Sequence, residues 1–435
     1  VCSGLLPLHV QKSLPREYPF VLGPKGITWE DFSDYAEELA KLSLGPNLLP
    51  LVAHGALRIA AMGFDNRPPT EVELTAMKNL LRAALQDGAW GMSTGLIYPP
   101  GSFAQTHELI SLAQVLAEYE TLFTTHVRGE SGALLTAIEE AITISRSSGA
   151  RVEVSHLKAL GQPNWGKGQA ALAMILAAQQ EGVTIGADQY PYEASSTSLT
   201  ALVPEWAHAG GIEKLLVRLE NPSLQERLQA ATKHELYVRG GPERVMIANL
   251  GSAEQAELSG LTVAAIASKW HMAPVDTVFK LLIDNGGAVG AVYFSISGDD
   301  VAAIVSSPEV AVGSDGHGLN TENDSGLFTH PRSYGTFPRV LGHFVREQGL
   351  LSLETAIYKM TGLPATRLGL KDRGFIKPGL VADLSIFDPT QEADKADFVN
   401  PHQYAVGINH VFVNGQAVVT DGHLTGRAGG RVLRK

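Results

Sequence analysis

The sequence contains a single cysteine, Cys2, and few charged residues: Asp, Glu, Lys and Arg make up 18% of its 435 residues. One cysteine excludes an intrachain disulfide and is typical of a reducing compartment. Uninterrupted apolar runs of about 20 residues, the length that crosses a bilayer, are absent from the sequence. With 44% hydrophobic residues, the low charge also excludes a disordered or coiled-coil chain. These absences predict a large globular protein of the cytoplasm.

Long basic runs are also missing. The chain has 34 Lys and Arg against 45 Asp and Glu, a net charge of −11, and its densest basic cluster is the short stretch 427–435. This balance disfavours a nucleic-acid partner, and the lack of a membrane-spanning run disfavours a membrane partner. We expect a small-molecule ligand, while the sequence indicates no oligomeric state. The first residue is Val1 rather than Met, so we expect the native start and any targeting segment to precede it.

Short apolar runs alternate with amphipathic stretches through the middle of the chain. The strand-like runs are 47–54, 89–96, 121–127, 151–157, 183–191 and 310–316. The helical stretches between them include 70–85, 106–119, 134–147 and 169–180. Strands alternating with helices predict a parallel sheet. Six or more such units favour a (β/α)₈ barrel, with a doubly wound sheet as the alternative.

Two parts of the chain depart from this alternation. Between residues 195 and 310 the pattern predicts two amphipathic helices, 211–232 and 262–285, and short strands at 244–249 and 289–295. We interpret this part as a lid or subdomain inserted at about 196–309 into a barrel domain that covers 1–365. The remainder, 366–435, contains strand-like runs and an Asn414-Gly415 turn typical of a β-hairpin. It is predicted to be a small β domain.

Polar residues follow the predicted barrel strands where each strand ends: His54, His126, His156, Tyr190 and Asp315. The carboxyl ends of parallel barrel strands meet on one face, where the catalytic residues of such barrels lie. We therefore expect these side chains to share one site.

Cys2, His126 and His156 together offer a thiolate and two imidazoles, a ligand set suited to zinc with one position left for water. Asp315 would then take the proton of that water. Each residue alone has a plainer structural explanation: a hydrogen-bonded histidine, a turn aspartate or a small buried cysteine. Their joint position at strand ends favours a metal site, and the role of His54 stays open.

Ordered motifs over nearly the whole chain carry a family resemblance. They include WGMSTGLIYPPGSFAQTHELI (90–110), THVRGESG (125–132), VEVSHLKALG (152–161), ADQYPYEASST (187–197), VGSDGHG (312–318) and HPRSYGTFPRVLGHF (330–344). In these motifs the chain resembles the N-acyl-D-amino-acid deacylases (D-aminoacylases) of the amidohydrolase superfamily. The resemblance implies a (β/α)₈ TIM-like barrel with a small β-sandwich domain built from both chain ends, of which 366–435 would be the C-terminal part.

The same resemblance implies one tightly bound zinc ion, held by Cys2, His126 and His156, and Asp315 as the catalytic acid and base. It also implies a set of substrate contacts. These are Lys158, Tyr190 and Arg332 around the substrate carboxylate, and Tyr98 near the scissile carbonyl.

The chain departs from the family at its beginning. The family carries a His-x-His pair on the first barrel strand, which helps to bind a second, looser metal, and no His-x-His occurs in this sequence. That pair would lie before Val1, so it either precedes the given residues or has been lost, and the first barrel strand and the first strands of the β-sandwich would be missing with it. The segment VCSGLLPL around Cys2 also matches the family's cysteine segment imperfectly.

The resulting prediction is a zinc-dependent hydrolase that converts N-acyl-D-amino acids to a D-amino acid and a carboxylate. One alternative is a cyclic-amide hydrolase of the hydantoinase or dihydroorotase type, in which a carboxylated lysine bridges two metals in place of the cysteine. The other is a metal-binding relative without catalytic activity. Retention of Asp315 with both histidines argues against the inactive relative.

Overall fold

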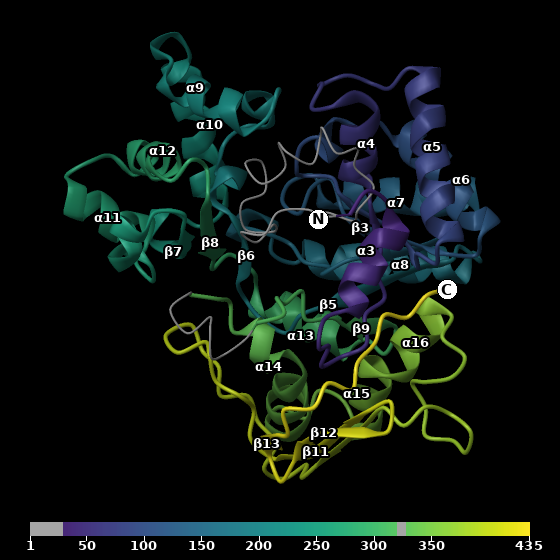
Figure 1. The fold of residues 1–435 in the computed structure, drawn as a ribbon. Coiled ribbons are helices and arrows are strands. Elements are labelled where there is room, and N and C mark those ends of the chain that lie inside the picture. Colours follow the sequence, from purple (N-terminus) through teal and green to yellow (C-terminus); the bar gives the residue numbers. More distant parts are fainter. Residues whose placement is uncertain (1–28, 320–327) are drawn as a thin grey trace.

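A computed structural model describes residues 29–319 and 328–435 (Figure 1). Its largest sheet has six parallel strands in the order β1-β2-β3-β4-β5-β9. Their bounds are β1 (Val52–Ala53), β2 (Gly91–Gly95), β3 (Leu122–His126), β4 (Arg151–Val154), β5 (Ile185–Gln189) and β9 (Val310–Val312). Each lies inside a run predicted from the sequence, so the expected succession of parallel strands is confirmed.

Helices connect these strands and cover the outside of the sheet (Figure 1). They are α3 (Phe32–Ala40), α4 (His54–Met62), α5 (Glu71–Gln86), α6 (Thr106–Glu118), α7 (Leu134–Ser148), α8 (Lys167–Gln180) and α13 (Gly298–Ser306). The start of α5 is fixed by a capping box between Thr70 and Glu73, and α7 ends at the left-handed Gly149. One continuous apolar core joins the inner faces of these helices to the strands. Within the described ranges, no helix is long and apolar enough to cross a membrane.

A second, antiparallel sheet lies between β5 and α13 in the sequence. It has the order β6-β8-β7, with β6 (Ser195–Ser198), β7 (Val245–Leu250) and β8 (Val289–Tyr293). Four helices belong to the same part: α9 (Ile212–Glu220), α10 (Gln225–Val238), α11 (Val263–Trp270) and α12 (Pro274–Asp284). These elements have a hydrophobic core of their own and project to one side of the parallel sheet (Figure 1).

Each of the two long helices predicted in this part is in fact a pair, so those predictions are wrong. The first breaks at Asn221, whose side chain caps a short turn that begins with Pro222. The second breaks because His271 is left-handed, with φ +53°, and Pro274 starts a new helix at its first position. Proline lacks the N–H that a continuing helix requires, yet it is well tolerated in a first turn.

From residue 332 on, the chain forms helix α14 (Arg332–Arg339), a π-helical turn (Val340–Glu347), α15 (Leu353–Met360) and α16 (Gly362–Leu368). An antiparallel sheet follows, with β10 (Leu384–Phe387), β11 (Ile408–Val413), β12 (Gln416–Thr420) and β13 (His423–Leu424). The predicted turn joins β11 to β12, and both Asn414 and Gly415 have the positive φ of a tight hairpin turn. This sheet lies below the helices α14 and α15 in Figure 1.

Glu392, in the segment between β10 and β11, makes stability depend on pH. Its carboxylate is buried and neither oxygen has a hydrogen-bond partner among the described residues. Burial raises the pKa of Glu392 to about 8, although Arg346 acts in the opposite direction. The unfolded chain therefore releases this proton at lower pH than the folded protein. Folding stability must fall as the pH rises from about 4.5 to about 8.

We expect Glu392→Gln to raise the melting temperature at pH 9 by roughly 2–6 °C, with a smaller change at pH 5. Thermal unfolding followed by circular dichroism at both pH values measures this difference. Glu354→Gln is a suitable control because the pKa of Glu354 is lowered, by hydrogen bonds from its own backbone and from Ser352. An equal effect of Glu392→Gln at both pH values would contradict the prediction.

Candidate active site

Four of the five polar residues predicted to share a site meet at the carboxyl ends of the parallel strands, whereas His54 pairs with Glu108 instead. His126 is the last residue of β3, and His156 follows the end of β4 by two residues. Tyr190 comes directly after β5, and Asp315 lies three residues after β9. Because these strands are neighbours in the sheet, the side chains form one continuous surface at its edge.

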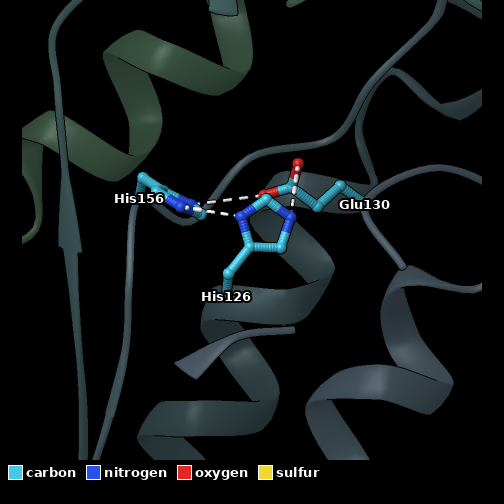
Figure 2. A group of neighbouring side chains, drawn as sticks. All are labelled: His126, Glu130 and His156. Atoms are coloured by element: carbon cyan, nitrogen blue, oxygen red, sulfur yellow. Dashed lines mark hydrogen bonds and ion pairs between the residues drawn. The ribbon is translucent and has the colours of Figure 1, made fainter. Parts of the chain in front are cut away.

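The two histidines face each other closely (Figure 2). His126 Nδ1 lies 3.0 Å from His156 Nε2, and the ring centroids are 4.5 Å apart. A third residue, Glu130, lies against both rings: its carboxylate is 3.2 Å from His156 Nδ1 and 3.5 Å from His126 Nε2. Ligand atoms of the three residues all lie within 4.8 Å of one another, so they form a candidate metal site.

The chemistry of this group fits a divalent cation. Burial lowers the pKa of His126 to about 3, which keeps the ring neutral and able to offer a lone pair. His126 Nε2 is buried beside the Glu130 carboxylate, 3.5 Å away, so the ring nitrogen that can offer this lone pair to a cation is Nδ1. Two imidazoles beside a carboxylate are a common ligand set for zinc and related ions. Cys2, the third ligand predicted from the sequence, lies outside the described residues.

Backbone conformation at the site is unusual. His156 has φ +43° and Asp315 has φ +47°. This left-handed conformation is energetically unfavourable for residues that have a Cβ. Asp188, on β5, helps to hold the first of these because its Oδ1 accepts the His156 backbone N–H at 2.7 Å. Such outliers persist where surrounding contacts over-determine them, and they concentrate at functional sites.

Glu130 is a site residue that the sequence analysis did not identify. It accepts a hydrogen bond from the Lys158 ammonium, and both side chains are buried. Burial alone would raise the pKa of Glu130, but the neighbouring His126, the Lys158 ammonium and a hydrogen bond from His156 hold it well below its usual value. Its only sequence signal is an acidic residue four positions after His126.

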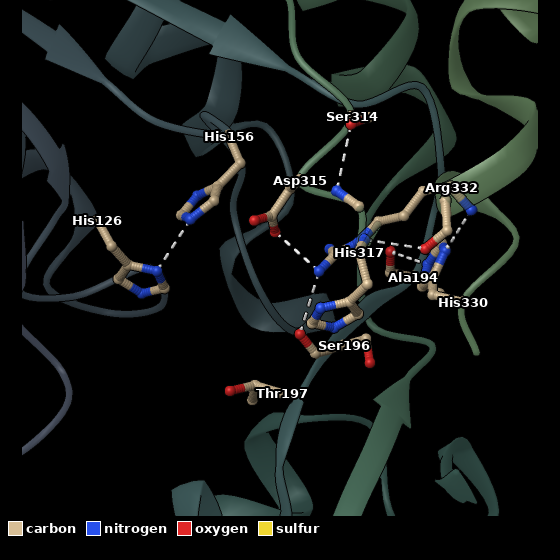
Figure 3. Close-up of polar contacts among 12 residues, drawn as sticks. His126, His156, Ala194, Ser196, Thr197, Ser314, Asp315, His317, His330 and Arg332 are labelled. Carbon is tan, nitrogen blue, oxygen red and sulfur yellow. Dashed lines mark hydrogen bonds and ion pairs between the residues drawn. The ribbon is translucent and has the colours of Figure 1, made fainter. Parts of the chain in front are cut away.

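Tyr190 lies between two cations. The Arg332 guanidinium carbon is 4.7 Å from the centre of the Tyr190 ring, and the Lys158 ammonium is 5.5 Å from it. Arg332 also forms an ion pair of 2.8 Å with Asp315 and donates to the Ser196 carbonyl at 3.3 Å (Figure 3). Arg332 Nη1 and the Tyr190 hydroxyl are buried without a hydrogen-bond partner among the described residues. Such groups are costly unless a ligand satisfies them.

Tyr98 lies on the other side of the histidine pair. Its ring centre is 5.3 Å from that of His126, and its hydroxyl shares a 2.8 Å hydrogen bond with Thr197 on β6. Burial raises the pKa of Tyr98 to about 12, so the hydroxyl stays protonated and can donate. Gly95 leaves room for the ring, since a Cβ there would lie 2.8 Å from it.

Two other polar groups near the site are engaged in ion pairs. His54 Nε2 lies 2.8 Å from Glu108, which also pairs with Arg58 at 2.5 Å, and all three side chains are fully buried. His54, whose role the sequence analysis left open, therefore belongs to an internal ion-pair network between α4 and α6. Arg128 pairs with both carboxylate oxygens of Glu140 at 3.0 Å.

A buried histidine missed by the sequence analysis, His330, supports the start of α14. His330 Nδ1 accepts the backbone N–H of Arg332 at 3.0 Å, and its Nε2 lies 2.9 Å from the Ala194 carbonyl (Figure 3). It thereby links the helix that carries Arg332 to the segment before β6.

Comparison with known proteins agrees with this geometry. The profile of the amidohydrolase family matches residues 26–419. A D-aminoacylase of Alcaligenes xylosoxydans xylosoxydans is 35% identical over 408 residues, which cover 94% of this chain and 74% of that protein. An N-acyl-D-aspartate deacylase of the same organism is 38% identical over 97% of this chain and 75% of its own length.

Solved structures give the same result. An N-acyl-D-glutamate deacylase from Bordetella bronchiseptica, crystallised with zinc and a phosphonate inhibitor, is 35% identical with a TM-score of 0.80, over 100% of this chain and 81% of that one. A crystal structure of a D-aminoacylase is 36% identical with a TM-score of 0.77, over 94% of this chain and 76% of that one. These similarities confirm the predicted barrel class with its small β domain. With the family match, they show that the chain belongs to the amidohydrolase family.

Proposed function

We propose that this protein uses zinc to hydrolyse N-acyl-D-amino acids to a D-amino acid and a carboxylate. The observation that carries the proposal is that two different binding positions, a metal seat and an anion seat, lie on either side of Asp315. On one side is the His126–His156 pair, and on the other is the Arg332–Tyr190 pair with its unpartnered buried atoms. The first suits a metal ion and the second suits a carboxylate. An N-acyl-amino acid carries its amide and its carboxylate at such adjacent positions.

The Arg332–Tyr190 pair forms an anion seat, which supports recognition of the α-carboxylate. Arg332 offers a planar fork of donors, the Tyr190 hydroxyl adds one more, and Lys158 contributes positive charge nearby. Anchoring the carboxylate there while the amide lies at the histidine pair leaves the side chain on Cα only one open direction. This arrangement supports selection of one enantiomer.

Asp315 is proposed as the proton carrier. A bound zinc ion lowers the pKa of its water to about 7 and polarises a carbonyl. The Asp315 carboxylate, whose side chain is 42% exposed, accepts a proton from the attacking water and returns it to the leaving amide nitrogen. The C–N bond breaks, and the acyl group keeps the hydroxyl of the water. Tyr98, protonated at neutral pH, is proposed to donate to the carbonyl oxygen.

We propose Cys2 as the third ligand of one tight zinc ion, and a weaker second metal only where a His-x-His pair is present. We also propose a barrel domain over 1–365 with an insertion at about 196–309, and the C-terminal part of a β-sandwich over 366–435. The separate cores of the barrel and the insertion support this division. The single cysteine supports a cytoplasmic location.

A panel of N-acetyl-D- and L-amino acids with neutral and acidic side chains tests the proposed reaction. We expect turnover of D forms only, by full-length protein that carries about one tight zinc ion per chain. A chelator should abolish turnover, and added zinc should restore it, because the water then regains its lowered pKa. Amine release and metal analysis by mass spectrometry are the measurements.

Two other results would overturn the proposal. Ring opening of a hydantoin or dihydroorotate without turnover of linear amides would identify a cyclic-amide hydrolase instead. Bound zinc without hydrolysis of any amide would identify a metal-binding relative that lacks activity.

A further inference from the structure

We infer that Glu130 is a positioning residue that fixes both histidines of the metal seat and, through the same carboxylate, the lysine beside the substrate. The inference rests on the proposed function for its metal, but its evidence is the contacts of Glu130 itself. No other buried carboxylate in the described ranges contacts two histidines and a lysine at once.

The contacts of Glu130 divide between its two oxygens. Oε1 lies 3.2 Å from His156 Nδ1 and also accepts a hydrogen bond from the Lys158 ammonium. Oε2 lies 3.5 Å from His126 Nε2. The backbone is fixed as well, because the Glu130 carbonyl accepts the N–H of Leu160 at 2.6 Å. The carboxylate is therefore held against both rings from the segment that follows β3.

These contacts bear on which nitrogen of each ring carries the proton. A neutral imidazole has one N–H and one lone pair, and an ionised carboxylate can only accept. Glu130 lies beside Nε2 of His126 and Nδ1 of His156 and favours N–H at both, but the Lys158 ammonium, 2.9 Å from His156 Nδ1, favours a lone pair there. His126 Nδ1 is then left as a lone pair 3.0 Å from His156 Nε2. A cation bound between these two nitrogens requires a lone pair on both, which places N–H at His156 Nδ1, where the Glu130 carboxylate can accept it.

The direction of the carboxylate separates this role from that of a direct ligand. Oε1 is already engaged by His156 and Lys158, and Oε2 lies on the side of the His126 ring that is turned away from His156 (Figure 2). Carboxylates that accept from the far nitrogen of a ligating histidine fix its tautomer and orientation, and their loss weakens metal binding about 10–100-fold.

The Lys158 contact extends the effect of Glu130 to the substrate side. The ammonium lies 2.9 Å from His156 Nδ1, donates to the His156 carbonyl at 3.1 Å and lies 5.5 Å from the Tyr190 ring centre. Without the carboxylate, this buried cation would lose the anion that holds it beside His156. Glu130 therefore couples the geometry of the metal seat to that of the anion seat.

Glu130→Gln, compared with Glu140→Gln, tests the inference on the full-length protein. Glu140 is a matched control because it is a largely buried glutamate of α7 that pairs with Arg128 and contacts neither histidine. We expect Glu130→Gln to weaken zinc binding about 10–100-fold in a chelator competition. Turnover at saturating zinc should show a raised KM with a smaller change in kcat. Glu140→Gln should leave zinc affinity within about twofold of the wild type.

Imidazole ¹⁵N NMR of the zinc-free protein provides a readout that does not depend on turnover. The wild type should show N–H at His126 Nε2, and Glu130→Gln should show a mixture of tautomers at that ring. Unchanged tautomers and unchanged zinc affinity in Glu130→Gln would overturn the inference. So would X-ray absorption showing that the variant has lost one oxygen ligand of zinc. Weakened zinc binding with no turnover of any N-acyl-D-amino acid would retain the inference and reject the proposed reaction.

Discussion

Replacement of Asp315 by Asn is expected to reduce kcat by about 10³-fold while leaving zinc content and folding unchanged. Asparagine has the same shape and tolerates the left-handed conformation, φ +47°, that Asp315 adopts. It cannot take a proton from water or return one to the leaving nitrogen. It also keeps a carbonyl oxygen that can accept from Arg332, now 2.8 Å from the carboxylate. Steady-state kinetics and metal analysis on the same preparation measure both effects.

Asp421→Asn is the matched control for this change. Asp421 also has a positive φ, +49°, but it lies between β12 and β13 and its side chain is 85% exposed. The control should retain full kcat. An Asp315→Asn variant with more than about a tenth of wild-type turnover would exclude Asp315 as the proton carrier.

Arg332→Lys is expected to lower kcat/KM by about 10²-fold, chiefly through KM. This corresponds to about 3 kcal/mol, within the range for loss of a buried charged contact. Lysine keeps the charge but loses the fork that lets Arg332 reach Asp315 and the Ser196 carbonyl while Nη1 remains open to a ligand. A substrate carboxylate would thus lose the hydrogen bond that Nη1 can donate. Kinetics with an N-acetyl-D-amino acid and with its α-amide measure the loss.

The α-amide lacks the carboxylate, so the wild type should already hydrolyse it with a low kcat/KM. Arg332→Lys should lower that kcat/KM little further, which makes the test specific to the carboxylate. Arg339→Lys is the control on the same helix. Arg339 stacks on Tyr192 at 5.0 Å and pairs with Asp394 at 3.4 Å, so it resembles Arg332 in its surroundings but not in its partner. Equal loss of kcat/KM in both variants would indicate a general effect on α14 rather than carboxylate recognition.

The parallel strands and their site residues were predictable because the hydrophobic pattern itself marks where each strand ends. His126, His156 and Asp315 follow short apolar runs, and parallel topology brings such positions to one edge. The order of strands from β1 to β5 likewise follows the order in the sequence. The helix ends in the insertion could not be predicted in this way, because the apolar spacing continues through Pro222 and Pro274 although the helices do not.

The contacts that select among polar residues could not be predicted in this way. Glu130 and Glu140 are both acidic and close to His126 in the sequence, yet only Glu130 turns back to the rings. His54 directly follows β1 and His126 ends β3, but the His54 ring is directed to Glu108 on α6. Side-chain direction depends on packing between elements far apart in the chain, which the spacing of residues along the sequence does not contain.

Strand β6 was also missed, since its sequence, Ser195–Ser198, has no apolar residue to mark it. This short strand is nevertheless where the insertion meets both substrate-facing groups. The Ser196 carbonyl accepts from Arg332, and the Thr197 hydroxyl bonds Tyr98. The metal seat, by contrast, is built from residues at or just after the ends of β3 and β4. Evolution can therefore exchange or reshape the insertion to change which acyl groups and side chains are accepted while the hydrolytic apparatus is inherited unchanged.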